Sequence, residues 1–384
     1  MGAETSKSCI ALLHAAALSL PGIAQAIEPP SEGQLRIGAS RYDEADLSSS
    51  NLVFGDKSRY EIDVFQLGIS APINEEWLFT ADVSHESMSG ASPQASVPGL
   101  GGDPQLIMSG ATIEDNRTAV NLSVGRYYSN WAWTIGFAHS DEDDYKSNGF
   151  DAALEIEVSD SWTLISTASF ATDKVDPVEA VEFNRVTNET RRAVSATIAA
   201  SKVINRSTAI QFGISYTKHS GFLSDPYKTQ DVRPDSRHEW AASTRLRHYV
   251  ENLNAALHVD YRYYEDSYGI EAHTVDLSWV QNIGPNWQLT PFVRYYAQDD
   301  ADFFSFTNNF ALPSQTPQSN DHRLAKFGSV SGGLAVSLTL PKSTITFDIE
   351  KYRAHEKYGL SSAAFNHPAA LQYTHLSLTW AIRL

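Results

Sequence analysis

The last ten residues of the chain alternate strictly between two kinds of side chain. One parity carries Leu376, Leu378, Trp380, Ile382 and Leu384, and the other carries His375, Ser377, Thr379, Ala381 and Arg383. Successive side chains of a β-strand point to opposite faces, so this segment predicts a strand with one apolar and one polar face. The apolar face continues to the final residue of the chain.

A strand of this kind resembles the closing strand of a bacterial outer-membrane barrel, although Leu384 stands where an aromatic residue is typical. The other end of the chain agrees with export. Residues 9–20 form an apolar stretch, and the small-residue site Ala24-Gln25-Ala26 follows Pro21 and Gly22. This order predicts a signal peptide over residues 1–26, with a buried helix as the alternative. The barrel is then expected over residues 27–384, without a cysteine after loss of Cys9.

Composition limits the class of protein further. Beyond the signal segment no apolar run approaches the roughly 20 residues of a membrane helix, which argues against a helical membrane protein. The mean hydropathy is -0.30 although aromatic residues make up 11% of the chain, as expected where strands have one lipid face and one water face. The net charge of -17 argues against nucleic-acid binding and favours cations as guests of a polar interior.

Period-two alternation recurs along the chain in about sixteen segments. Their spans are 34–42, 59–71, 77–88, 113–126, 131–143, 147–158, 162–174, 191–203, 208–219, 238–249, 253–265, 270–283, 287–299, 323–340, 343–355 and 372–384. An even number of strands closes a barrel with both termini on one side. The prediction is therefore an all-β fold: one transmembrane, antiparallel, up-and-down β-barrel.

The connections between these segments alternate in length. Short turns are separated by long polar loops at 43–58, 89–112, 175–190, 220–237, 300–322 and 356–371. Bacterial barrels have short periplasmic turns and long extracellular loops, and we assign the two rims accordingly. Trp77, Trp131, Trp162 and Trp287 each begin a strand after a short turn. We expect them in one interfacial aromatic ring, rather than as separate core anchors.

Several phrases resemble a known bacterial family. They are SGASP at 89–93, SGATIEDNRTAV at 109–120, GFLSDPYK at 221–228, RPDSR at 233–237, VDYRYYEDSYGIEAHT at 259–274 and FVRYYAQDDADFF at 292–304. They resemble the family called domain of unknown function 3570, over most of the mature chain. The resemblance implies an outer-membrane barrel in the bacterial envelope and carries no activity. The resemblance also implies that members are often encoded near thioredoxin-like and flavin-transferring exported proteins, which points to redox chemistry in the envelope without assigning this chain a part in it.

Chemistry is then expected in the lumen. The inward parity of four consecutive strands carries Arg245, Arg247, His258, Asp260, Arg262, Asp276 and Arg294. With tight hairpins, Ser243, Asp260, Asp276 and Arg294 form one cross-strand row. Three interpretations stay open: charged side chains that brace the wall, a constriction that sorts solutes by charge, and a catalytic carboxylate pair. A second arc is acidic and comprises Asp82, Glu86, Glu142, Asp151, Glu155, Glu157, Asp348 and Glu350.

Loop residues supply further candidates. Phe303, Phe304, Phe306 and Phe310 make one loop too apolar to be free, so it is a candidate plug or a protein contact. The segment DEDDY at 141–145 could offer oxygen ligands to Ca²⁺, but we expect a solvated acidic tip without a metal. His85 and His139 have outward parity while Ser84 and Ser140 do not. This disfavours a lipid-facing hydrolase and favours contact with lipopolysaccharide.

The resulting expectation for function is a passive channel for small hydrophilic solutes with a preference for cations. The alternative is a closed or plugged barrel that acts as a scaffold for an exported envelope assembly. An enzyme is disfavoured because the sequence shows no nucleophile with a base and no cofactor or metal pattern. Expected partners are outer-membrane lipid and lipopolysaccharide, and an envelope protein.

Overall fold

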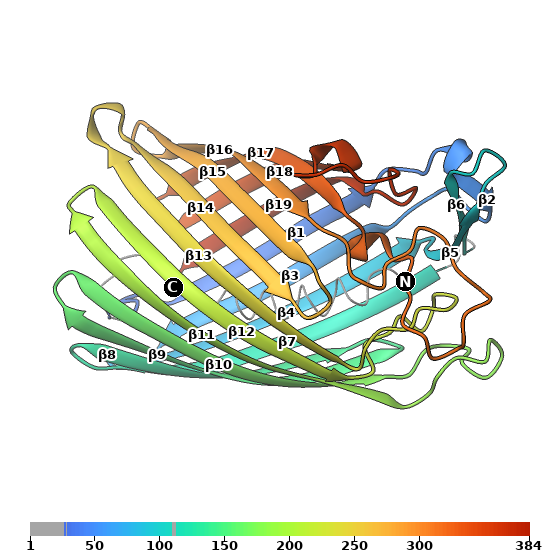
Figure 1. Cartoon of the computed structure of the whole chain (residues 1–384). Coiled ribbons are helices and arrows are strands. Elements are labelled where there is room, and N and C mark those ends of the chain that lie inside the picture. The colour runs from blue at the N-terminus through green and yellow to red at the C-terminus, as the bar shows by residue number, and fades with distance from the viewer. Residues whose placement is uncertain (1–26, 28, 110–112) are drawn as a thin grey trace.

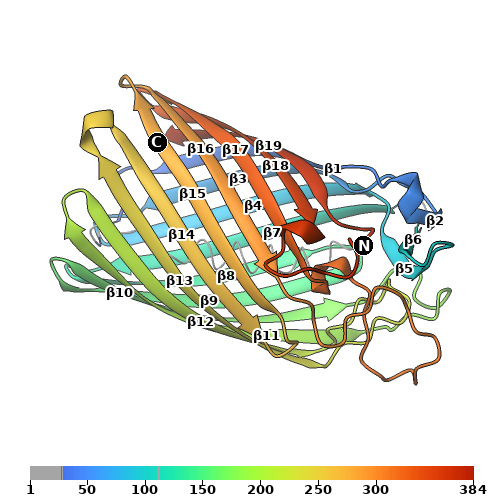
Figure 2. The same cartoon turned by 45° about the horizontal axis from the view of Figure 1, so that its top comes forward.

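A computed structural model describes residues 27, 29–109 and 113–384. Its described part is dominated by one closed barrel of sixteen antiparallel strands, in which each strand pairs with its neighbours along the barrel (Figures 1 and 2). The barrel strands are β1 (Gln34–Glu44), β3 (Glu61–Pro72), β4 (Trp77–Gly90), β7 (Ile113–Tyr127), β8 (Trp131–Asp141), β9 (Tyr145–Ser159), β10 (Trp162–Val175), β11 (Glu189–Asn205), β12 (Thr208–Gly221), β13 (Ser236–Val250), β14 (Ala255–Asp266), β15 (Glu271–Ile283), β16 (Trp287–Gln298), β17 (Phe327–Leu340), β18 (Ser343–His355) and β19 (Gln372–Arg383). This confirms the predicted fold class.

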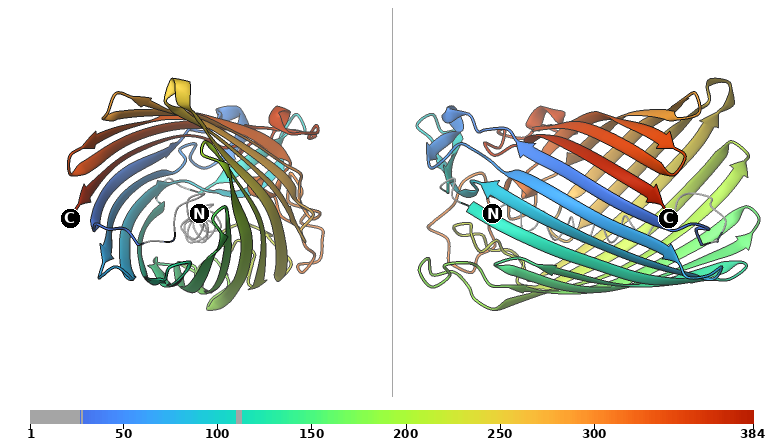
Figure 3. Two further views of the ribbon diagram at one scale, coloured as in Figure 1. Left: turned by 90° about the vertical axis from the view of Figure 1, so that its left-hand side faces the viewer. Right: turned by 180° about the vertical axis from the view of Figure 1, so that it is seen from behind.

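The barrel closes between its first and last strands. β1 pairs with β19 in a register that runs from Gln34 opposite Arg383 to Glu44 opposite Tyr373. Seen along its axis, the molecule is a ring of tilted strands (Figure 3). In the described part of the chain, no helix is both long and apolar enough to span a membrane.

Alternation decides which side chains face outward. On β19 the side chains of Leu378 and Trp380 are 51% and 44% exposed, although both are apolar. Their neighbours Ser377 and Thr379 have the opposite parity and face the interior of the barrel. A continuous outer band of exposed apolar side chains is expected on a barrel whose outer face contacts lipid. A polar interior is the other feature of such barrels.

The two rims differ as the loop lengths predicted. Short turns lie at one end of the barrel in Figure 1, and the long loops gather at the other. We call these ends the short-turn rim and the long-loop rim.

Two of the long loops have more order than the sequence suggested. Strands β2 (Leu52–Phe54), β5 (Pro93–Pro98) and β6 (Pro104–Met108) form a separate three-stranded sheet outside the barrel. Leu106 and Met108 are buried there with Leu47, Ala91 and Ala369. A small apolar core thus joins the loops after β1, β4 and β18, which were expected as polar loops.

Candidate functional site

The predicted lumen residues lie on the inward face of β13 to β16. Arg247 pairs with His258 across β13 and β14, while Arg262 lies two residues further along β14 from Asp260. The opposite parity of these strands carries exposed apolar residues such as Leu277 and Val293, which fixes the inward direction.

The cross-strand row on this wall differs by one member from the prediction. Asp260 faces Asp276 and Asp276 faces Arg294, as expected, but Arg245 rather than Ser243 is the partner of Asp260. Ser243 instead faces Arg262. The turn between β13 and β14 is longer than a tight two-residue turn. The 3-10 turn η2 (Glu251–Leu253) and Asn254, which is left-handed, lie between the paired residues Val250 and Ala255. The register therefore shifts by two residues.

Ion pairs neutralise part of this wall. The Arg247 guanidinium donates to both oxygens of Asp260, with 2.9 Å between Nη2 and Oδ2. Arg294 Nε donates to Asp276. Arg262 has no carboxylate partner in the described chain and stacks on Tyr264, 5.1 Å from the ring centroid. Arg245 makes no ion pair within the described residues either.

Carboxylates without a basic partner lie on other arcs of the wall. In the described part of the chain, Asp151 and Glu155 on β9 and Asp348 and Glu350 on β18 make no ion pair. By contrast, Arg36 pairs with Asp82 at 2.7 Å and Arg117 pairs with Glu86 at 2.9 Å. Glu157 accepts a hydrogen bond from the backbone N–H of Ile27 at 3.1 Å. Among the predicted wall residues of the described chain, five carboxylates thus lack a basic side-chain partner, against two arginines that lack an acidic one.

Loops from three arcs of the barrel meet over the long-loop rim. They follow β4, β12 and β16, and between two and four other strands separate each pair of loops in the barrel order. We call segments 93–98, 222–235 and 299–326 of these loops the loop cap, together with segment 356–371 after β18, which joins them through His367 and Asn320. The N–H of Thr229 donates to Gln94 O at 2.9 Å and that of Asn308 donates to Ser96 O at 3.0 Å. These backbone contacts tie the three loops together across the opening.

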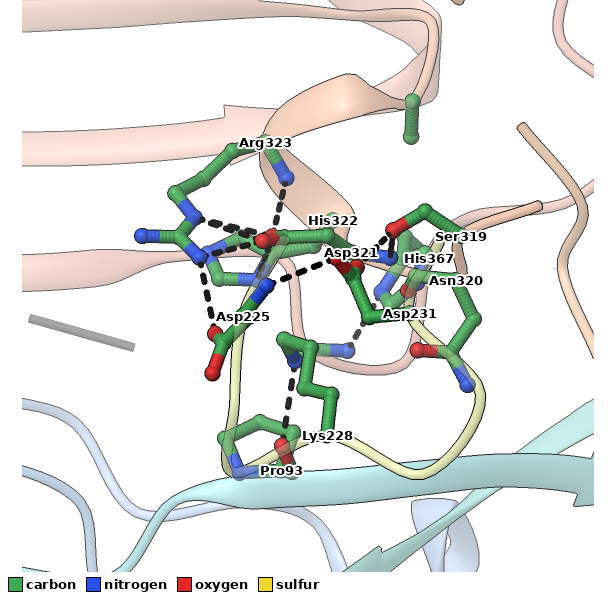
Figure 4. Close-up of polar contacts among 12 residues, drawn as sticks. Pro93, Asp225, Lys228, Asp231, Ser319, Asn320, Asp321, His322, Arg323 and His367 are labelled. Carbon is green, nitrogen blue, oxygen red and sulfur yellow. Dashed lines mark hydrogen bonds and ion pairs between the residues drawn. The ribbon is translucent and has the colours of Figure 1, made fainter. Parts of the chain in front are cut away.

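A buried charge network holds the loop cap, with Asp321 at its centre (Figure 4). Arg323 Nε donates to Asp321 Oδ1 at 2.8 Å, and Arg233 Nη2 donates to Oδ2 at 2.9 Å. Arg233 also donates to Asp231 at 2.7 Å. Lys228 in the same network reaches Pro93 O at 3.0 Å. The buried carboxylates Asp231 and Asp321 are thus ion-paired with arginines, as the desolvation cost of a buried charge requires.

Two histidines complete this network in the neutral form. His367 Nε2 lies 3.0 Å from Asn320 O, and the N–H of Ala369 donates to Nδ1 at 3.1 Å. Nε2 must therefore carry the proton while Nδ1 accepts. Burial lowers the pKa of His367 to about 4. Burial also holds the pKa of His322 well below its ordinary value, although Asp321 opposes the shift.

Burial alone would raise the pKa of Asp321. The guanidinium of Arg323, the ammonium of Lys228 and the guanidinium of Arg233 outweigh it and hold that pKa well below the ordinary value. The carboxylate at the centre of the loop cap is therefore charged at neutral pH. The histidines beside it are uncharged.

The candidate plug phenylalanines lie in the loop cap and do not act as one group. Phe303 packs edge-on against Tyr268, with 4.9 Å between ring centroids. Phe304 and Phe306 are 5.0 Å apart and lie beside His367. Phe310 is separate, with 61% of its surface exposed. Three of the four thus join loops to one another.

The acidic tip at 141–145 is not the solvated tip that the sequence suggested. Glu142 and Asp144 are buried, and their carboxylate oxygens lie within 4.8 Å of each other and of Asp115 on β7. Arg117 Nε approaches Glu142 at 3.4 Å, and the hydroxyl of Tyr227 donates to Asp144 at 2.5 Å. These two contacts offset the burial of Glu142 and Asp144.

The outward histidines are bound to strand neighbours. His85 Nδ1 lies 3.1 Å from Thr118 Oγ1, and His139 Nδ1 lies 3.0 Å from Asn148 Oδ1. Ser140 has the opposite parity, and its hydroxyl accepts from Arg117 at 2.8 Å.

The family model described as "Protein of unknown function (DUF3570)" matches residues 10–367. The chain belongs to this family. No curated protein matches it in sequence.

Solved structures share the barrel. A bacterial polysaccharide outer membrane secretin superposes with a TM-score of 0.51 at 10% identity, over 92% of this chain and 98% of that chain. CdiB from Acinetobacter baumannii gives 0.50 at 10% identity, over 92% of this chain and 60% of that one. OprB from Pseudomonas putida gives 0.45 at 9% identity, over 92% and 94%. At these identities the likeness concerns the fold, which is that of outer-membrane barrel proteins.

Proposed function

We propose that this protein is a channel of the bacterial outer membrane that admits small hydrophilic solutes and prefers cations. The observation that carries the proposal is the charge imbalance of the inner wall. Asp151, Glu155, Asp348 and Glu350 lack a basic partner within the described chain, while only Arg245 and Arg262 lack an acidic one among the predicted wall residues. Charged rings of one sign on a water-filled wall favour ions of the opposite sign.

Reversal potentials across a planar bilayer in a salt gradient test this preference. We expect the native protein to give the reversal potential of a cation-selective channel. The variant D348N/E350Q is expected to give a reversal potential closer to that of a channel without selectivity. The matched control is E61Q/D63N, which removes two carboxylates from the outer face, where Arg41 pairs with both. A shift of equal size in the control, or an anion-selective native channel, contradicts the proposed preference.

A closed scaffold is the second candidate, and the loop cap favours it. Backbone hydrogen bonds and the buried network around Asp321 both cross the opening. Ser305 N donates to Ser319 O at 2.9 Å, so the ends of segment 305–318 already lie side by side. Deletion of residues 305–318 therefore shortens the loop without stretching its ends. Conductance only after this deletion supports a closed barrel, whereas conductance in both proteins supports the open channel.

A further inference from the structure

The outer face carries a strip of exposed cations on four consecutive strands, close to the long-loop rim. Lys146 lies on β9, Lys174 on β10, Arg192 on β11 and Lys218 on β12, and all four side chains are exposed. Their parity is that of Phe150, Phe170 and the other exposed apolar residues of the same strands. The strip therefore borders the apolar band at its long-loop end.

The cations are close to one another in the sheet. Lys146 and Lys174 are direct cross-strand partners. Arg192 faces Thr172, which makes it a diagonal neighbour of Lys174, and Lys218 is in turn diagonal to Arg192. Diagonal neighbours lie about 7–8 Å apart, within reach of one multivalent anion.

The protein balances only one of the four charges of this strip with an acidic side chain. Lys146 pairs with Asp141 at 3.0 Å, while Lys174, Arg192 and Lys218 have no acidic partner in the described chain. Like charges directly opposite on neighbouring strands are destabilising. The chain as a whole carries a net charge of -17, so the strip is a local exception. Elsewhere on this rim Arg41 is matched by Glu61 and Asp63.

We propose that this strip binds the phosphate groups of lipopolysaccharide in the outer leaflet. The proposal rests on the outer-membrane location proposed above, in which the long loops face outward and the strip lies at head-group depth. Arginine and lysine bind phosphate through charge-assisted hydrogen bonds, and each basic residue near an anionic membrane surface adds to the attraction. Phosphates would also relieve the repulsion between Lys146 and Lys174.

Binding of purified lipopolysaccharide to the folded, detergent-solubilised protein tests the site. We expect K174Q/R192Q/K218Q to bind about 100-fold more weakly, from roughly fivefold for each lost cation. The control K351Q/R353Q removes two exposed outward cations from β18, away from the strip, and is expected to bind like the native protein. Dephosphorylated lipopolysaccharide is expected to bind the native protein as weakly as the intact lipid binds the triple variant.

Three results would overturn the proposal: native affinity in the triple variant, an equal loss in the control, or equal binding of dephosphorylated lipid. Heat-modifiable migration on a gel reports whether each variant is folded. If the triple variant does not fold, the three single substitutions are measured, and unchanged affinity in all three overturns the site. Conductance of the triple variant is recorded separately, because loss of lipid binding with unchanged conductance leaves the channel proposal intact.

Discussion

Lowering the pH from 7.5 to 5.0 is expected to loosen the loop cap through His367. The packed cap requires Nδ1 of this residue as an acceptor for the N–H of Ala369. A second proton on the ring would place two donors against each other. Burial lowers the pKa of His367 to about 4 from the ordinary 6.5. An opened loop that exposes the ring to water restores the ordinary value.

The sign and size of the effect follow from linkage. Between pH 6.5 and 4 the opened loop binds a proton that the packed loop does not, so the stability of the packed form falls as the pH drops through this window. From pH 7.5 to 5.0 the ratio of opened to packed loop rises about 30-fold, or about 2 kcal/mol. The lowered pKa of His322 acts in the same direction. Asp321, whose pKa is lowered, loses its charge only at more acidic pH.

Hydrogen exchange measures this opening directly. The N–H groups of Asp321 and Arg323 are bonded inside the loop cap. After correction for the intrinsic rate, their protection is expected to fall about 30-fold between the two pH values. A peptide from β11 is the internal reference. In H367Q, which keeps a donor for Asn320 O but cannot titrate, much of the pH dependence is expected to vanish. Constant protection in the native protein, or an unaltered pH dependence in H367Q, refutes the reasoning.

Three other perturbations have clear expectations. D321N leaves the buried Arg233 and the partly exposed Arg323 short of their shared carboxylate, and it is expected to destabilise the packed cap by about 3–5 kcal/mol, measured by exchange. D299N alters an ion pair whose carboxylate is 49% exposed and is expected to have little effect. L378K places a charge on the lipid face in mid-strand and is expected to cost about 2–4 kcal/mol in unfolding titrations in bilayers, and a similar cost for the inward S377K would contradict the assigned faces. R262Q removes an unpaired positive charge from the lumen and is expected to increase cation selectivity in reversal-potential measurements, and an unchanged potential would place Arg262 off the ion path.

The barrel could be predicted because its determinants are local. The alternation of apolar and polar residues, as in residues 131–137 of β8, predicts that the segment is a strand. It also predicts which face of the strand each side chain occupies. The short turns then order the strands, since adjacent hairpins leave one simple way to close the sheet. The turn between β13 and β14 is longer than predicted, and Asn254 is the residue that could have indicated this. Asparagine tolerates the left-handed conformation, which Asn254 adopts at φ 49°.

The loop cap could not be predicted because its contacts are distant in sequence. Ser96 and Asn308 are 212 residues apart, and Arg233 and Asp321 are 88 apart. Aspartate and arginine in a Pro-containing loop usually indicate a solvated segment. The sequence pattern does not predict that two such residues from different loops will form a buried ion pair. The same holds for Glu142, whose burial depends on an arginine from a different strand.

The separations in the loop cap also bear on the order in which the molecule forms. Hairpins such as β15–β16 need only neighbouring residues, whereas the contact of Lys228 with Pro93 closes a loop of 135 residues. Long loops lose more entropy on closure, so such contacts form late in folding. The cap segments cannot meet until the strands that carry them have been placed around the ring. Acquisition of a protected Asp321 amide would therefore report the last step of folding, after β1 has joined β19.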